Sequence, residues 1–140
     1  MKLVKPQNGL LPMPIYRPVH GQQAVELVED FHFQNFTIPA GTICNGQTIP
    51  AVFWPIVGSL FEPLSFPASV VHDDLYWTGK ATFEGKEYPV TRARADATFY
   101  DMCLLYGGDS KIIRVRAYLK YIGLRLGGWR VWNRYRRENK

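Results

Sequence analysis

The chain has 140 residues, of which 46% are hydrophobic and 21% are charged. This length and balance are typical of one globular domain whose core is large enough to fold without a structural metal or a disulfide. No stretch of the sequence approaches the length of a membrane span, and the net charge of +5 is concentrated near the C-terminal end.

The N-terminal segment, residues 1–23, holds four prolines and predicts an extended arm. No long apolar run follows its first basic residues, so we expect a protein made in a cytoplasm without a signal peptide. The core domain is expected over residues 24–126 and a basic, aromatic tail over residues 127–140.

Local patterns predict short strands first and helices after, which is the order of a single small α+β domain with three packed helices. Expected strands cover 24–33 and 36–41, followed by a loop over 42–50 and, further on, a hairpin over 81–90. Expected helices cover 67–76 with Ser65 as a cap, 92–106, 110–126 and, after an interruption at Gly127-Gly128, 129–137.

Two ionisable side chains fall on the apolar stripes of neighbouring helices. Helical spacing places His72 on a face with Ala68, Val71 and Leu75, and Asp96 on a face with Phe99, Tyr100 and Cys103. A buried carboxylate is costly unless it is paired, and a buried histidine is its natural partner. We therefore expect a ring nitrogen of His72 within hydrogen-bond reach of Asp96, on antiparallel helices. The other nitrogen would accept a proton from water, and a satisfied core histidine is the alternative.

Four segments together resemble the family called domain of unknown function 1353. They are Ile38-Pro39-Ala40-Gly41, Asn45 to Pro50 with Phe53-Trp54-Pro55, His72 to Tyr76, and Arg94 to Phe99. The family pattern reads, in the same order, a Pro-x-Gly turn, Asp-Gly-x-Ser-Ile-Pro with an aromatic-Trp pair, His-Asp-x-Leu-Tyr, and Ala-Asp-x-x-Phe. Members are mostly encoded among phage structural genes. The resemblance implies a bacteriophage virion protein, associated with the tail, that binds other virion proteins in a multi-subunit assembly.

The same skeleton resembles the short bacterial phospholipases A2, which carry an Asp-Gly loop, His-Asp-x-x-Tyr on one helix and Asp-x-x-Phe on the next. This resemblance implies a hydrolase acting on the phospholipid of the host membrane. His72 would be the general base, Asp96 its orienting partner, and Tyr76 would hydrogen-bond the pair. A non-catalytic structural component of the particle is the alternative function.

The phospholipase resemblance also implies Ca²⁺ as a cofactor. The Asp73 carboxylate and backbone carbonyls around Asn45 and Gly46 would be its ligands. The chain departs from the pattern at two points: Asn45 replaces the loop aspartate, and Ser69 stands three residues before His72 in a stretch that lacks the phospholipase cysteine.

The basic residues predict an anionic partner. Residues 111–140 hold ten basic residues against one acidic residue, Glu138, and aromatic residues alternate with arginines over 129–137. We expect a helix over 111–137 whose aromatic side packs on protein and whose arginines meet an acidic neighbour or lipid, with nucleic acid as the weaker alternative. Cys44 and Cys103 are expected to be two buried thiols, and the three histidines fit no zinc-site spacing.

Overall fold

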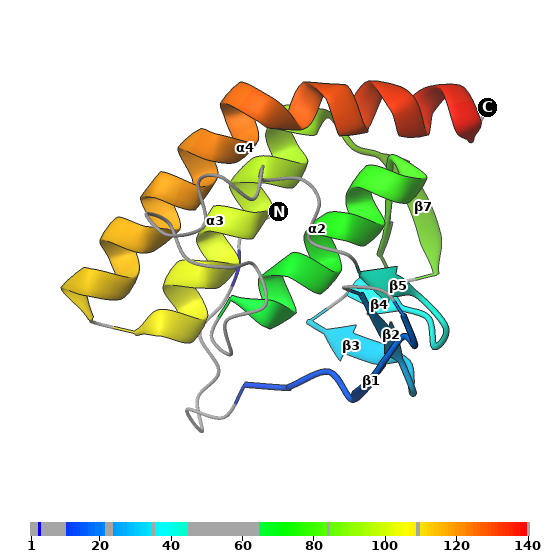
Figure 1. The fold of residues 1–140 in the computed structure, drawn as a ribbon, viewed down its shortest axis with the longest axis horizontal. Coiled ribbons are helices and arrows are strands. Elements are labelled where there is room, and N and C mark those ends of the chain that lie inside the picture. The colour runs from blue at the N-terminus through cyan, green and yellow to red at the C-terminus, as the bar shows by residue number, and fades with distance from the viewer. Residues whose placement is uncertain are drawn as a thin grey trace.

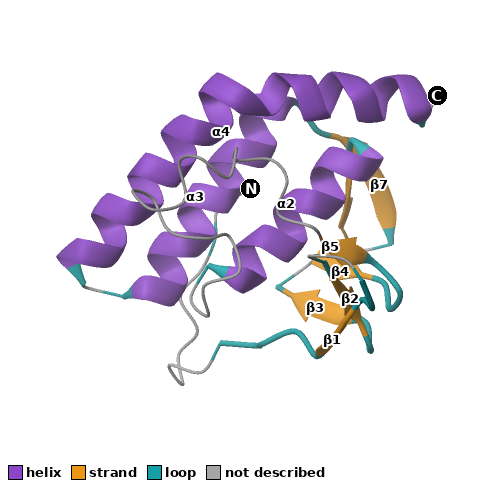
Figure 2. Cartoon of the chain, viewed as in Figure 1, coloured by secondary structure: helices purple, strands orange, loops and turns teal. Residues whose placement is uncertain are grey.

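The computed structural model describes Leu3 and residues 11–21, 24–34, 36–44, 65–83, 85–108 and 110–139. It has the predicted α+β architecture, in which three helices pack together beside short antiparallel strands (Figures 1 and 2). The helices are α2 (Phe66–Thr78), α3 (Arg92–Gly107) and α4 (Lys111–Glu138). The strands are β1 (Tyr16–Pro18), β2 (Val25–Leu27), β3 (Phe31–Phe33), β4 (Phe36–Ile38), β5 (Ile43–Cys44), β6 (Lys80–Phe83) and β7 (Lys86–Pro89).

The described strands form three small antiparallel sheets, ordered β1-β2-β5, β3-β4 and β6-β7. The single strand expected over 24–33 is wrong, because β2 and β3 belong to different sheets. The chain bends between them, and the side chain of Asp30 accepts a hydrogen bond from the backbone N–H of Ala40 at 2.8 Å. An aspartate that bonds nearby backbone in this way favours a turn over a continued strand.

Side-chain hydroxyls cap two of the helices, but the cap expected at Ser65 is wrong. The Thr91 hydroxyl accepts from the N–H of Arg94 at the start of α3, and the Ser110 hydroxyl accepts from the N–H of Ile113 at the start of α4. Ser65 precedes α2, but its hydroxyl makes no cap and instead accepts from the ammonium of the buried Lys120 at 2.8 Å. Helix α2 ends at Gly79, whose left-handed backbone carries a φ of 68°.

Helix α4 is continuous from Lys111 to Glu138, so the interruption expected at Gly127-Gly128 is wrong. Gly128 is buried against α2, where a Cβ would overlap the hydroxyl of Tyr76. Close packing of the two helices therefore explains a glycine inside the helix. Figure 1 shows α4 bent along its length, with its outer side convex over α3 and α2.

The C-terminal end of α4 is bound to the end of α2. The guanidinium of Arg136 donates to the carbonyls of Tyr76 at 2.6 Å and Trp77 at 2.7 Å, and the Asn139 amide donates to Trp77 at 2.7 Å. Burial lowers the pKa of Arg136. These contacts satisfy helix-end carbonyls that have no partner within α2. The helix expected over 111–137 is confirmed. Arg136, one of its arginines, binds α2 of the same chain.

Helix α2 lies at the centre of the fold and contacts α3, α4, β4, β5 and β6. Every residue from Phe66 to His72 is buried, because helices cover one side of α2 and strands cover the other. Such all-round burial explains why α2 lacks a clear polar face. Among the described residues, no helix combines the length and the apolar character needed to cross a bilayer.

Candidate functional site

His72 and Asp96 form a buried pair between α2 and α3. The Nε2 atom of His72 lies 2.9 Å from the Oδ1 atom of Asp96, and both side chains are fully buried. The two helices run side by side in opposite directions (Figure 1). The predicted geometry is therefore confirmed. Since a carboxylate only accepts hydrogen bonds, Nε2 carries a proton in this pair.

Three more side chains donate to Asp96. The Tyr76 hydroxyl reaches Oδ1 at 2.6 Å, the guanidinium of Arg125 reaches Oδ2 at 2.8 Å, and that of Arg92 reaches Oδ2 at 3.5 Å. Burial alone would raise the pKa of Asp96, but the bonds from His72, Tyr76 and Arg125 lower it below its ordinary value. Burial and the charge of Asp96 raise the pKa of Tyr76. Asp96 is therefore a carboxylate fixed by its neighbours.

The two arginines are site residues that sequence reasoning missed. Arg92 stands four residues before Asp96, a spacing that signals an ion pair on one helix. Its guanidinium also donates to the carbonyls of Leu124 at 3.1 Å and Arg125 at 3.2 Å, which ties α3 to α4. Arg125 reaches Asp96 from α4, and no local pattern in the sequence marks that contact.

The second ring nitrogen of His72, Nδ1, is buried without a hydrogen-bond partner among the described residues. The Oδ1 atom of Asp73 lies 3.9 Å from Nδ1, which is too long for a hydrogen bond. Burial would lower the pKa of His72, but the carboxylates of Asp73 and Asp96 outweigh it and raise the pKa above 6.5. When the ring is neutral and Nε2 holds the proton, Nδ1 carries a free lone pair.

Acidic side chains follow His72 on the same helix. Burial and the charge of Asp73 raise the pKa of Asp74 to about 6. Burial and the charges of both aspartates raise the pKa of Cys44, so the end of β5 lies beside them. Asn45 and Gly46, predicted to supply calcium ligands, lie outside the described residues. No group of three metal-binding side chains occurs in the part of the chain that the structure describes.

Aromatic rings enclose the pair. The His72 ring lies 4.1 Å from that of Tyr76 and 5.5 Å from that of Phe99, measured between centroids, and Trp132 packs edge-on against Tyr76 at 5.2 Å. Ser69 donates to the carbonyl of Ser65 inside α2. Cys44 and Cys103 are both buried thiols and form no disulfide with each other, as predicted.

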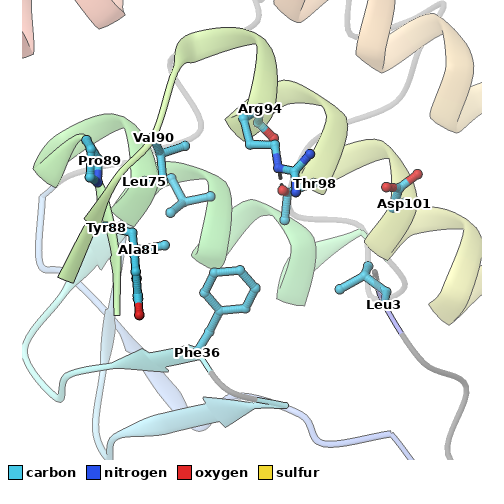
Figure 3. A pocket seen from close by; sticks show the side chains of 10 residues that line it. All are labelled: Leu3, Phe36, Leu75, Ala81, Tyr88, Pro89, Val90, Arg94, Thr98 and Asp101. Atoms are coloured by element: carbon cyan, nitrogen blue, oxygen red, sulfur yellow. Dashed lines mark hydrogen bonds between the residues drawn. The ribbon is translucent and has the colours of Figure 1, made fainter. Parts of the chain in front are cut away.

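An apolar pocket of about 480 Å³ lies away from the pair. It is lined from β4, α2, the β6-β7 hairpin and α3 by Phe36, Leu75, Ala81, Tyr88, Pro89, Val90, Arg94, Thr98 and Asp101, together with Leu3 (Figure 3). Helical spacing places Arg94 and Asp96 on opposite faces of α3. The pocket and the buried pair are therefore separate features, and no predicted catalytic residue lines the pocket.

Residues 22–123 match the family described as protein of unknown function (DUF1353). The chain belongs to this family. It is also similar to an uncharacterized protein, y4jT, of Sinorhizobium fredii (strain NBRC 101917 / NGR234), with 42% identity over 53 residues. That match covers 34% of this chain and 16% of the relative, so the chain spans only a small part of the relative's length. No solved structure matches the chain.

Proposed function

We propose that this DUF1353 protein is a hydrolase that cleaves an ester of host-envelope phospholipid, with His72 as its general base. The observation that carries the proposal is the unequal state of the two ring nitrogens. Nε2 is held by Asp96 at 2.9 Å, while Nδ1 is buried and has no hydrogen-bond partner among the described residues. A structural histidine gains most when both nitrogens are bonded, whereas a base needs one nitrogen held and the other free.

The reaction follows from that arrangement. Nδ1 takes a proton from a water molecule as the water oxygen bonds to the ester carbonyl carbon. The tetrahedral intermediate then collapses, the ester C–O bond breaks, and the proton passes from Nδ1 to the departing alcohol oxygen. Asp96 keeps the proton on Nε2 and stabilises the imidazolium that forms between the two steps. Tyr76 and Arg125 hold Asp96 in place as positioning residues.

Calcium belongs to the same proposal through Asp73, whose carboxylate lies beside His72. When bound, a cation there would polarise the ester carbonyl and stabilise the oxyanion. The described residues alone do not build a complete site, so no step above depends on the metal. Calorimetric titration with Ca²⁺ should give binding heat with the wild type and none with Asp73→Asn. Absence of heat in both would remove the metal from the proposal.

The location of the protein in a phage particle is also a proposal. The four motifs that resemble those of phage-encoded family members support it. We infer a bacteriophage virion protein, associated with the tail and bound to other virion proteins. Purified particles should then contain the chain when probed with an antibody. A chain found only in the lysate would contradict the inference.

A non-catalytic structural role is the second candidate, and the full burial of both partners favours it. Asp96 has donors on both oxygens, as expected for an ion pair that fixes helix packing. In that case the wild-type protein turns over no substrate, and the only effect of changing His72 or Asp96 is a loss of stability.

The deciding assay follows the release of fatty acid from phospholipid vesicles, with purified peptidoglycan as a second substrate. Each is tested with calcium, with zinc and with chelator. We expect wild-type turnover of phospholipid and a loss of about 10³-fold or more in His72→Asn. The matched control is His32→Asn, which changes an exposed histidine bonded to Thr37 and should keep full activity. No turnover of either substrate under any condition would refute the hydrolase and leave the structural role.

A further inference from the structure

The outer face of α4 carries an exposed apolar stripe. Its members, called the α4 stripe below, are Ile112, Val115, Leu119, Leu126 and Trp129, with exposed fractions of 69%, 60%, 36%, 74% and 48%. They are spaced three, four, seven and three residues apart, so they share one side of the helix. The buried residues Ala117, Lys120, Leu124 and Gly128 lie on the opposite side, against α2 and α3.

A stripe of this kind differs from ordinary surface composition. Single exposed apolar residues are common on soluble proteins, but a continuous row along a long helix marks a surface that binds something. Helix packing within the chain does not explain the stripe, because the buried side of α4 already supplies the contacts to α2 and α3.

The charges around the stripe have one sign. Exposed basic residues on α4 are Lys111, Arg114, Arg116, Arg130, Arg134 and Arg137, and no acidic residue occurs from 111 to 137. Helical spacing places Arg116, Arg130 and Arg134 along one edge of the stripe and Lys111 and Arg114 along the other. The remainder of the chain, residues 1–110, holds seven basic and eleven acidic residues. An anionic surface would therefore attract this face and repel the rest of the protein.

We propose that the outer face of α4 binds the surface of a membrane rich in anionic phospholipid. A large apolar side with basic flanks is the pattern of a helix that lies in the headgroup layer, and Trp129 with Arg130 stacked on its ring at 5.3 Å suits that layer. In this proposal α4 lies along the bilayer surface.

The spacing of the stripe also fits a partner helix, but two observations favour the lipid. Pairing with a second copy would place basic edges against basic edges, which is repulsive. The bend of α4, convex on its outer side in Figure 1, prevents a straight partner helix from following the whole stripe, whereas a fluid bilayer surface accepts a curved helix. This surface is independent of the proposed hydrolase, since none of its residues contacts the His72–Asp96 pair.

Vesicle binding tests the proposal. Full-length protein is mixed with vesicles of phosphatidylcholine alone or with phosphatidylglycerol in equal parts, and the bound fraction is measured by sedimentation. We expect binding to the anionic vesicles only, weakened by high salt. Exchanging Val115 and Leu126 for glutamate should reduce binding about tenfold or more, because each leaves an apolar contact unmade. Both residues are highly exposed, so the fold is expected to persist, as circular dichroism will check.

The matched control is Val28→Glu, which introduces the same charge at a residue 48% exposed and outside α4. It should bind like the wild type. The proposal is overturned if the wild type ignores anionic vesicles, binds neutral ones equally well, or binds unchanged after the stripe is altered. It is also overturned if sedimentation without lipid shows a dimer that the stripe variant abolishes, because a second copy would then be the occupant.

Discussion

Replacing Asp96 with alanine tests how much stability the buried pair supplies. The change leaves the Nε2 atom of His72 and the Tyr76 hydroxyl without their acceptor, and both lie in the core. Each stranded buried donor costs about 1–3 kcal/mol. Arg125, whose side chain is 32% exposed, can rehydrate and adds little. The expected loss is about 4 kcal/mol, within the range of about 3–5 kcal/mol for removing one partner of a buried ion pair.

Urea unfolding followed by circular dichroism measures this loss. With a slope of about 1–3 kcal/mol per M, the midpoint should fall by about 2 M. Asp101→Ala is the matched control, because it removes an exposed carboxylate from the same helix and should change stability by less than about 0.5 kcal/mol. If Asp96→Ala cost no more than Asp101→Ala, the claim that this pair holds α2 to α3 would be refuted.

Three further changes test other contacts. His72, Tyr76, Arg92 and Arg125 face Asp96, and its pKa in the folded protein is lower than the ordinary value of 3.8. Its ionised form therefore stabilises the fold at pH values above 3.8, and this stabilisation is lost as the pH falls below 3.8. Acid unfolding of Asp96→Asn should therefore be shallower than that of the wild type, and equal slopes would contradict the assignment. Gly128→Ala should destabilise the protein despite its better helix propensity, because the new Cβ overlaps the Tyr76 hydroxyl. Tyr76→Phe removes both the overlap and the bond to Asp96, so the double variant should lose less stability than the sum of the two single variants, as thermal unfolding will show. Arg136→Ala should lower the melting temperature by about 2–4 °C by freeing two carbonyls at the end of α2, whereas a change at the exposed Arg137 should have almost no effect.

The sequence predicts the parts of this fold that depend on local chemistry. The helices expected to begin at residues 92 and 110 begin at Arg92 and Lys111, and the buried pair follows from helical periodicity around His72 and Asp96. The pairing is predictable because a carboxylate on an apolar face needs a partner, and adjacent helices supply one.

The features that the sequence does not predict depend on contacts between segments far apart along the chain. Gly128 stands inside a helix because Tyr76 packs against it, and a glycine pair in isolation is typical of a break. Arg125 joins Asp96 across 29 residues of sequence, so no periodicity brings the two together. The break between β2 and β3 depends on Asp30 bonding to the backbone of Ala40, a contact formed only when the chain turns back.

The central claim is that Nδ1 of His72 is the free base of a pair fixed through Nε2. Nitrogen NMR of the labelled imidazole, recorded at a pH high enough for the ring to be neutral, measures this directly. We expect the proton on Nε2 and an unprotonated Nδ1, with part of the population moving to the other tautomer in Asp96→Asn. A neutral His72 in the wild type with its proton on Nδ1 would contradict the account, because that nitrogen would then have no lone pair with which to accept a proton.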